Sequence, residues 1–297
     1  MKLMRTPEER FQEITDFPFE ARYLEIDGIR IHFIDEGSKD KDCILLMHGE
    51  PSWSYLYRHM IPILIKAGYR TIAPDLVGFG RSDKPSEQSD HTYHKHVEWM
   101  TKWVKVLNLK DITLFCQDWG SLIGLRVAIE NQERFSRIVL SNGGLPTGEQ
   151  KTNDAIMQWR EFSRTSPKFD IKSIMQSGTI SKLSKETLKG YNAPFPDDSY
   201  KAGPRIMPSL IPISKTDPEH GANKKAIEQY RKWEKPFLTA FSDSDPISKG
   251  VDKFWQKIVP GAKAQDHVTI KNASHFVQED KGPELADVII NFIKNIL

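Results

Sequence analysis

Residues 112–124 read ITLFCQDWGSLIG, and this stretch predicts the fold as well as the chemistry of the chain. A short β-prone run ends at Cys116, and a helix-compatible run begins at Trp119. Asp118 lies between them, with the small residues Cys116 and Gly120 two positions away on either side. This is the small-x-nucleophile-x-small pattern of a nucleophile elbow, with a carboxylate where many elbows carry serine. An ionised carboxylate can attack carbon directly, because no base is needed to deprotonate it.

Asp118 also has a second interpretation, because aspartate often caps the helix that follows it. The motif alone does not choose between a nucleophile and a helix cap. The choice depends on whether the rest of the chain supplies partners for a nucleophile.

Composition excludes several classes of function. The 297 residues include 42 Lys and Arg against 40 Asp and Glu, a formal net charge of +2, and the basic residues are scattered. We therefore expect no nucleic-acid partner and no membrane partner. Cys43 and Cys116 both lie in apolar runs, which predicts two buried, reduced thiols rather than a disulfide framework. The length fits one large α/β domain or a core with a smaller subdomain.

The sequence contains no spacing that is typical of a metal site. It has no CxxC and no HExxH, and its nine histidines are dispersed. We therefore expect neither a metal nor a cofactor. The first ten residues contain no apolar signal core, and no apolar run approaches the roughly 20 residues that a membrane span needs. A soluble, cytoplasmic protein is expected.

Strand-like and helix-like segments alternate along most of the chain. A hairpin is expected at residues 22–26 and 29–34, around Asp27-Gly28. Further strands are expected over residues 43–47, 70–74, 112–116, 137–141, 236–241 and 267–270. Helices are expected over residues 52–66, 97–107, 155–162 and 283–296. This alternation favours a mostly parallel sheet that is covered by helices on both faces.

The strand pattern stops between about residues 145 and 226, where proline is frequent and short helical segments predominate. We therefore predict an α/β core domain of residues 1–145 and 226–297. A helical cap domain of residues 146–225 is predicted as an insertion after the sixth strand.

Candidate catalytic residues follow the predicted strands, at the edge where open α/β sheets bind ligands. Asp118, Asp245 and His275 occur in the order nucleophile, acid and histidine that is expected of α/β-hydrolases. His275 is the predicted general base for a water molecule, and Asp245 is the predicted acid that orients its imidazole. The backbone N–H groups of Glu50 and Trp119 are the candidate donors of an oxyanion hole.

The acid of the triad has competitors nearby in the sequence. Asp243 and Asp252 flank Asp245, and an aspartate before proline is common in turns. Position favours Asp245, but spacing alone does not decide between Asp245 and Asp243.

Four motifs resemble the haloalkane dehalogenases. They are HGEPSW at residues 48–53, the loop at residues 75–82, QDWG at residues 117–120 and SHFVQE at residues 274–279. The resemblance extends over most of the chain, including the insert. It implies an α/β-hydrolase fold with a mostly parallel eight-stranded sheet and a helical cap. It also implies hydrolysis of a haloalkane by water alone, which gives an alcohol, a halide ion and a proton.

The same resemblance implies a halide site made of two donors. Trp119 is the first, because an indole N–H donates a hydrogen bond but cannot accept a proton. One subfamily supplies the second donor as Asn after His-Gly, where this chain has Glu50, and the other supplies a cap Trp, where this chain has Trp159. Asn142 is not an acid, which supports Asp245 as the triad acid. The chain thus resembles the subfamily with two Trp donors, although packing of the cap is an alternative role for Trp159.

Other proteins with this fold have different functions. An epoxide hydrolase shares the fold and triad but needs acidic O–H donors in the cap, and Tyr191 and Tyr200 are candidates. Trp119 disfavours this function, because a halide requires N–H donors whereas an alkoxide requires a proton. Asp118 excludes a serine esterase, and a fluoroacetate-type dehalogenase would have Arg at position 119. A ligand receptor of this fold is the non-enzymatic alternative, although such proteins typically lack a triad member.

Overall fold

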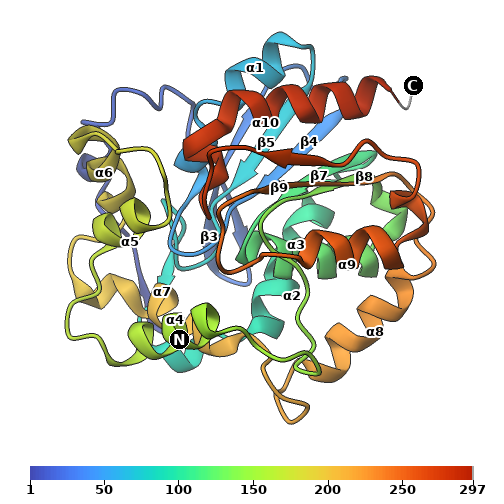
Figure 1. Cartoon of the computed structure of the whole chain (residues 1–297). Coiled ribbons are helices and arrows are strands. Elements are labelled where there is room, and N and C mark those ends of the chain that lie inside the picture. The colour runs from blue at the N-terminus through green and yellow to red at the C-terminus, as the bar shows by residue number, and fades with distance from the viewer. Residues whose placement is uncertain (296–297) are drawn as a thin grey trace.

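The computed structural model describes residues 1–295, which build a twisted eight-stranded sheet between two layers of helices (Figure 1). The strand order is β10-β9-β8-β7-β4-β5-β3-β2. Its strands are β2 (Arg22–Ile26), β3 (Ile29–Glu36), β4 (Cys43–Met47), β5 (Arg70–Pro74), β7 (Ile112–Cys116), β8 (Phe135–Leu140), β9 (Phe237–Ser242) and β10 (Val268–Ile270). Strand β3 pairs antiparallel with β2 and β5, and the other pairs are parallel.

All eight predicted strands are confirmed, with bounds that differ from the prediction by at most two residues. The central strands β4 and β7 are buried along their whole length. Their uninterrupted apolar sequences are those required of strands covered on both faces. Outside this sheet, β1 (Leu3–Met4) and β6 (Lys84–Pro85) form a short antiparallel pair.

Helices cover both faces of the sheet (Figure 1). On one face lie α1 (Ile61–Lys66) and α10 (Val277–Lys294). On the other lie α2 (Tyr93–Val106), α3 (Trp119–Glu130), α8 (His220–Tyr230) and α9 (Val251–Ile258). Helix α9 was not among the predicted elements. The predicted α/β-hydrolase architecture is thus present.

The single helix predicted over residues 52–66 is wrong. The structure has a 3₁₀ turn at Ser54–Tyr57 and then the short helix α1. Pro62 explains the interruption, because proline lacks an N–H and its ring clashes with the carbonyl four residues earlier in a continuous helix. In the first turn of α1 the same residue is tolerated.

Two other helices, α2 and α10, begin several residues earlier than predicted. Helix α2 begins at Tyr93 because Thr92 caps it, and the Thr92 hydroxyl accepts a hydrogen bond from the Lys95 N–H at 3.1 Å. Helix α10 begins at Val277 and is kinked at Lys281, two residues before Pro283. It ends at Lys294, so the predicted end at Ile296 lies outside the described residues. No helix within residues 1–295 is both long and apolar enough to cross a membrane.

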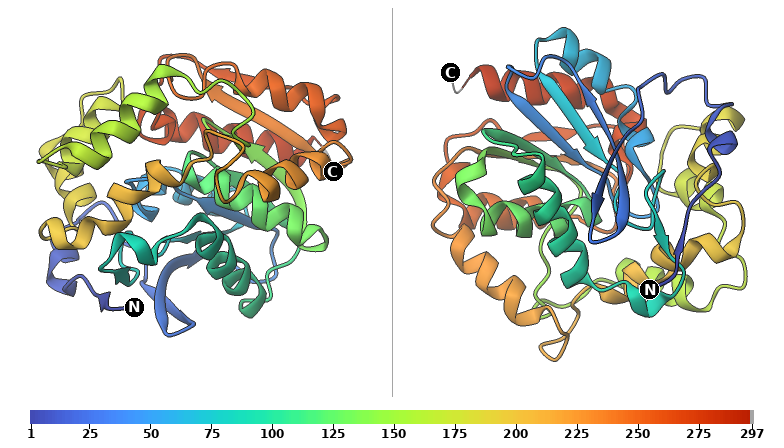
Figure 2. Two further views of the ribbon diagram at one scale, coloured as in Figure 1. Left: turned by 90° about the horizontal axis from the view of Figure 1, so that it is seen from below. Right: turned by 180° about the vertical axis from the view of Figure 1, so that it is seen from behind.

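The chain forms a group of helices after β8, the sixth strand of the sheet in chain order, and these helices lie to one side of the sheet (Figures 1 and 2). These are α4 (Asp154–Thr165), α5 (Ile171–Ser177), α6 (Lys185–Asn192) and α7 (Ala202–Leu210). The next helix, α8, spans the predicted domain boundary between residues 225 and 226. It packs on α3, where the Tyr230 hydroxyl donates to the Leu125 carbonyl at 2.7 Å. The division into core and cap domains therefore stays a prediction.

Candidate active site

Asp118 lies in the sharp turn between β7 and α3 with a positive φ of 50° and a ψ of −129°. Glycine makes this turn possible, because a Cβ built at Gly120 would lie 2.0 Å from the Met47 carbonyl oxygen. The Asp118 side chain makes no capping hydrogen bond to α3. The helix-cap interpretation of Asp118 therefore fails, and the strained backbone turn expected of a nucleophile elbow is present.

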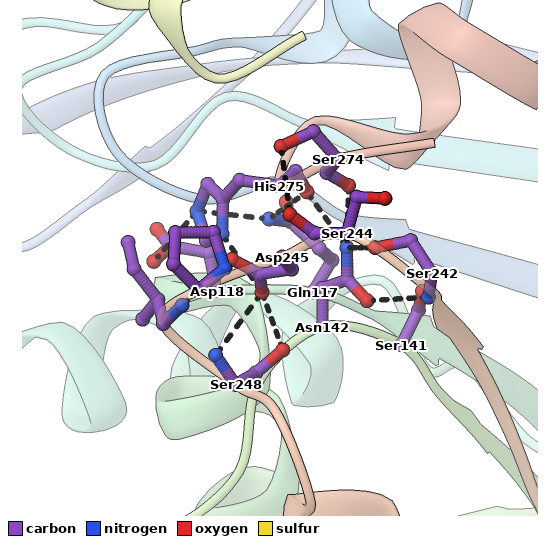
Figure 3. A network of polar contacts seen from close by, with 12 residues as sticks. Gln117, Asp118, Ser141, Asn142, Ser242, Ser244, Asp245, Ser248, Ser274 and His275 are labelled. Atoms are coloured by element: carbon purple, nitrogen blue, oxygen red, sulfur yellow. Dashed lines mark hydrogen bonds and ion pairs between the residues drawn. The ribbon is translucent and has the colours of Figure 1, made fainter. Parts of the chain in front are cut away.

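Three predicted residues converge at the carboxyl ends of the strands (Figure 3). The Glu50 backbone N–H donates to Oδ1 of Asp118 at 2.7 Å. The other oxygen, Oδ2, lies 3.4 Å from Nε2 of His275. On the far side of the ring, Nδ1 lies 3.2 Å from Oδ2 of Asp245. The imidazole is thus placed between two carboxylates that come from different loops.

Asp245 rather than Asp243 faces the histidine. Asp245 is 4% exposed, and its carboxylate also accepts hydrogen bonds from the backbone N–H and the hydroxyl of Ser248. Asp243 is exposed and contacts the neighbouring Ser244 hydroxyl at 3.0 Å. Burial raises the pKa of Asp245, but the charge of His275 and these hydrogen bonds outweigh it and lower the pKa to about 2. Of the two aspartates that spacing left open, Asp245 is therefore the one that lies beside the histidine.

The same electrostatics act on His275, which is 7% exposed. Burial lowers its pKa, but the negative charges of Asp245 and Asp118 outweigh burial and raise the pKa to about 10. Each carboxylate therefore stabilises the imidazolium. The two carboxylates are therefore already in place to stabilise a positive charge that develops on His275 during a reaction.

The loop that carries the Glu50 N–H is held by buried contacts. His48 is fully buried, and its Nε2 accepts a hydrogen bond from the Leu76 N–H at 2.9 Å. Asp75, also fully buried, accepts from the Ser54 N–H at 2.8 Å and lies 2.7 Å from Nδ1 of His32. These contacts fix the loop, so the N–H that points at the nucleophile is preorganised.

The Glu50 side chain is a feature that sequence reasoning missed. It is 3% exposed, and its Oε1 has no hydrogen-bond partner among residues 1–295. Burial and the charge of Asp118 raise the pKa of Glu50 well above its usual range, while His275 and a hydrogen bond from the Trp159 side chain act in the opposite direction. The only signal in the sequence is an acidic residue that follows an apolar strand between glycine and proline.

A cavity of about 440 Å³ opens beside Asp118. Trp119, from the first turn of α3, and Trp159, from α4, both line it. The Trp119 ring is 1% exposed and packs edge-on against Tyr93, and its indole N–H has no acceptor within the described residues. The half-buried Trp159 ring packs against Phe169. Other walls come from Leu122, Leu145, Ile156, Ile211, Val251 and Phe254.

The two tyrosines considered as acid donors lie elsewhere. The Tyr191 hydroxyl donates to Glu279, and no tyrosine of residues 1–295, Tyr200 included, lines the cavity beside Asp118. Within the same residues, no group of three or more His, Cys, Asp or Glu side chains is arranged to hold a metal ion. The groups that line the cavity include the Asp118 carboxylate and the indole rings of Trp119, Trp159 and Trp255.

Comparison with known proteins gives the family. A family model described as the alpha/beta hydrolase fold matches residues 42–282. A haloalkane dehalogenase of Psychrobacter cryohalolentis is 50% identical, in an alignment that covers 99% of this chain and 98% of the relative. Another from Mycolicibacterium paratuberculosis is 49% identical with full coverage of both chains. The chain belongs to the haloalkane dehalogenase family.

Solved structures of this family agree with that assignment. The structure of the haloalkane dehalogenase DpaA from Paraglaciecola agarilytica has a TM-score of 0.91 and 34% sequence identity, with 97% of both chains covered. The haloalkane dehalogenase DatA from Agrobacterium tumefaciens, at 22% identity and a TM-score of 0.81, shares the fold. The predicted enzyme class, a hydrolase of the haloalkane dehalogenase family, is confirmed together with the fold.

Proposed function

We propose that this chain cleaves the carbon–halogen bond of haloalkanes in two steps, with Asp118 as nucleophile and His275 and Asp245 as the pair that activates water. Trp119 and Trp159 hold the departing halide. The products are an alcohol, a halide ion and a proton. No cofactor takes part in either step.

In the first step, a carboxylate oxygen of Asp118 attacks the carbon that carries the halogen. The new C–O bond forms as the carbon–halogen bond breaks, and the bonding electron pair leaves with the halide. Negative charge therefore moves from the carboxylate to the leaving group. Two indole N–H groups aimed at that position stabilise it without offering a basic site that competes for a proton.

In the second step, water attacks the ester carbonyl carbon while Nε2 of His275 removes its proton. Asp245 stabilises the imidazolium that forms. The oxyanion of the tetrahedral intermediate is bound by the backbone N–H groups of Glu50 and Trp119. The intermediate then collapses, and the bond between its central carbon and the alkoxide oxygen breaks. The alcohol leaves with one proton of the water, and His275 releases the other proton to solvent, so that the carboxylate of Asp118 is restored.

The observation that carries this proposal is the buried Trp119 indole N–H, which lies beside the nucleophile and has no acceptor within residues 1–295. A buried donor without a partner carries a desolvation cost unless a ligand supplies the acceptor. Trp103, Trp233 and Trp255 also lack an acceptor in the described chain. Of the four, only Trp119 follows Asp118 directly, so position and missing acceptor together support its role.

The subfamily with a second Trp donor in the cap is part of the same proposal. Trp159 lines the same cavity as Trp119 and Asp118. Glu50 has no amide donor of the kind that asparagine would offer at this position. The shared cavity and the residue type at position 50 support Trp159 as the second halide donor.

The variant Trp119→Phe tests the proposal. Removing one hydrogen bond to a charged leaving group costs roughly 1.5–3 kcal/mol, which corresponds to a decrease of about 10- to 150-fold in kcat/KM. The assay is bromide release from 1-bromobutane. Trp103→Phe is the matched control, because Trp103 is equally buried and its N–H also lacks an acceptor among the described residues, but it does not line the cavity.

Equal rates for the Trp119 and Trp103 variants would contradict the halide role of Trp119. A crystal soaked in bromide provides an independent test, because the ion is expected between the indole N–H groups of Trp119 and Trp159. Hydrolysis of styrene oxide in place of bromide release would favour the epoxide hydrolase alternative.

A further inference from the structure

Asn142 follows β8 at the same edge of the sheet as the triad. It is fully buried and has a positive φ of 23°, a conformation that asparagine tolerates better than most residues. Its backbone carbonyl accepts a hydrogen bond from the Asp118 N–H at 3.0 Å. The residue is therefore attached directly to the nucleophile elbow.

The side-chain amide of Asn142 reaches two other loops (Figure 3). Its Oδ1 accepts from the Ser242 N–H at 2.9 Å, at the end of β9. Its Nδ2 lies 2.8 Å from the Ser242 hydroxyl, 2.8 Å from the Ser274 carbonyl and 3.1 Å from the His275 carbonyl. Through its backbone carbonyl and its side-chain amide together, Asn142 thus joins the elbow, the strand that leads to Asp245 and the histidine loop.

A second amide acts on the same carbonyl. The buried side chain of Gln117 donates from Nε2 to the His275 carbonyl at 3.1 Å, and the same nitrogen lies 3.3 Å from Nε2 of the imidazole. The His275 carbonyl therefore accepts from two amides that come from two neighbouring strands. The ring itself is less tightly held, because its contacts to Asp118 and Asp245 measure 3.4 and 3.2 Å.

We propose that Asn142 is a positioning residue for His275, with Gln117 in a supporting role, and that it acts in the hydrolysis of the ester rather than in its formation. This inference rests on the proposed function. Attack by Asp118 on the substrate requires no base. Attack by water, by contrast, requires the imidazole to lie within hydrogen-bond reach of the water molecule that attacks the ester carbonyl carbon. A displacement of a catalytic group by about 1 Å can cost roughly 100-fold in rate.

The test is Asn142→Ala assayed with 1-bromobutane on the rapid-mixing timescale. We expect a burst of one bromide ion per active site at the wild-type rate, followed by turnover that is slower by about 10- to 100-fold. Because the ester forms before the slowed step, kcat and KM fall together and kcat/KM is unchanged. Intact-protein mass spectrometry should show the butyl adduct during turnover.

Asn131→Ala is the matched control. Asn131 is also buried and donates to the Val127 carbonyl at 2.8 Å, but it lies at the other end of α3, roughly 18 Å from the elbow. The Asn131→Ala variant also loses one buried side-chain amide, but this amide does not contact His275. The variant should therefore keep the wild-type kinetics. Gln117→Met removes only one of the two donors to the carbonyl, so it should show the same pattern with a smaller decrease in kcat, even if Asn142→Ala folds poorly.

Two results would overturn the inference while leaving the proposed function in place. One is an Asn142→Ala enzyme with wild-type kcat. The other is a parallel loss of kcat and kcat/KM without an adduct in either the Asn142 or the Gln117 variant. A wild-type enzyme that releases no bromide would instead overturn the proposed function, and the inference with it.

Discussion

At the scale of single residues, the imidazole of His275 lies between the carboxylates of Asp118 and Asp245. In the proposed mechanism, Asp245 keeps its charge throughout, whereas Asp118 becomes a neutral ester after the first step. Loss of the Asp118 charge removes one of the contributions that raise the pKa of His275. Formation of the ester therefore makes the imidazole easier to deprotonate at the moment when a base is required.

The variant Asp118→Asn mimics the neutral ester and tests this coupling. The pKa of His275, about 10 in the wild type, should fall, and NMR titration of the imidazole would measure the change. Because the folded pKa lies above the ordinary value of 6.5, the stabilisation from protonated His275 is fully present below that pH and is lost as pH rises towards 10. Between pH 6.5 and 10, the unfolding free energy of the variant should therefore decrease by less than that of the wild type. An unchanged titration would contradict the coupling.

From residue type and order, Asp118, Asp245 and His275 were each predicted to follow a strand, and the structure brings these three side chains together. The choice of Asp245 over Asp243 required coordinates, because both precede the same turn and only one carboxylate is buried against the ring. The positioning contacts of Asn142 could not be predicted either. They join Asn142 to residues that are 100 to 133 positions away, and an amide gives no sign in the sequence of which carbonyl it binds.

At the scale of elements, the start of α3 presses directly on β4. Gly120→Ala should therefore be destabilising, because its Cβ would lie 2.0 Å from a backbone oxygen of Met47 that cannot move aside easily. Overpacking of this kind typically costs roughly 1–3 kcal/mol, which denaturant unfolding would measure. Gly221→Ala in α8 is the control, because its Cβ would meet nothing within 4 Å. Equal stabilities of the two variants would contradict the close approach of α3 to β4.

Strand positions were predicted better than helix positions. The central strands β4 and β7 are short apolar runs, which a parallel sheet covered on both faces requires. The failure between residues 52 and 66 came from one imino acid, Pro62, in a stretch whose apolar spacing alone resembles a helix. The start of α2 depends on the hydrogen bond that the Thr92 side chain accepts, and the spacing of apolar residues gives no indication of this cap.

At the scale of the whole molecule, a buried polar cluster joins the helical segment after β8 to the sheet. The Tyr191 hydroxyl of α6 donates to Glu279 of α10, and Glu279 is paired with Arg58. Arg58 also binds Asp16 at 2.8 Å near the N-terminus. Four distant segments therefore meet at one site beneath the helical segment.

The variant Tyr191→Phe removes only the tie from α6, because Glu279 keeps its partner Arg58. Loss of a hydrogen bond to a charged group should lower the unfolding free energy by roughly 1.5–3 kcal/mol, and amide hydrogen exchange should rise in α5 and α6. Tyr200→Phe is the control, since the Tyr200 hydroxyl makes no hydrogen bond to other described residues and the ring is half-buried. Wild-type exchange rates in α6 of the Tyr191 variant would show that this contact does not hold the segment.

Among the tryptophans that line the cavity, Trp119 and Trp159 belong to different helices, Trp119 to α3 and Trp159 to α4. Under the proposed clamp, the gap between their indole nitrogens depends on how α4 is seated, whereas the nucleophile stays with the sheet. Chloride, bromide and iodide differ in radius. The preference of the enzyme among these halides would therefore depend on the distance between the helices that carry the two indole nitrogens. Substitutions beneath α4 could then change which halogen leaves most readily, without altering any atom that touches the carbon under attack.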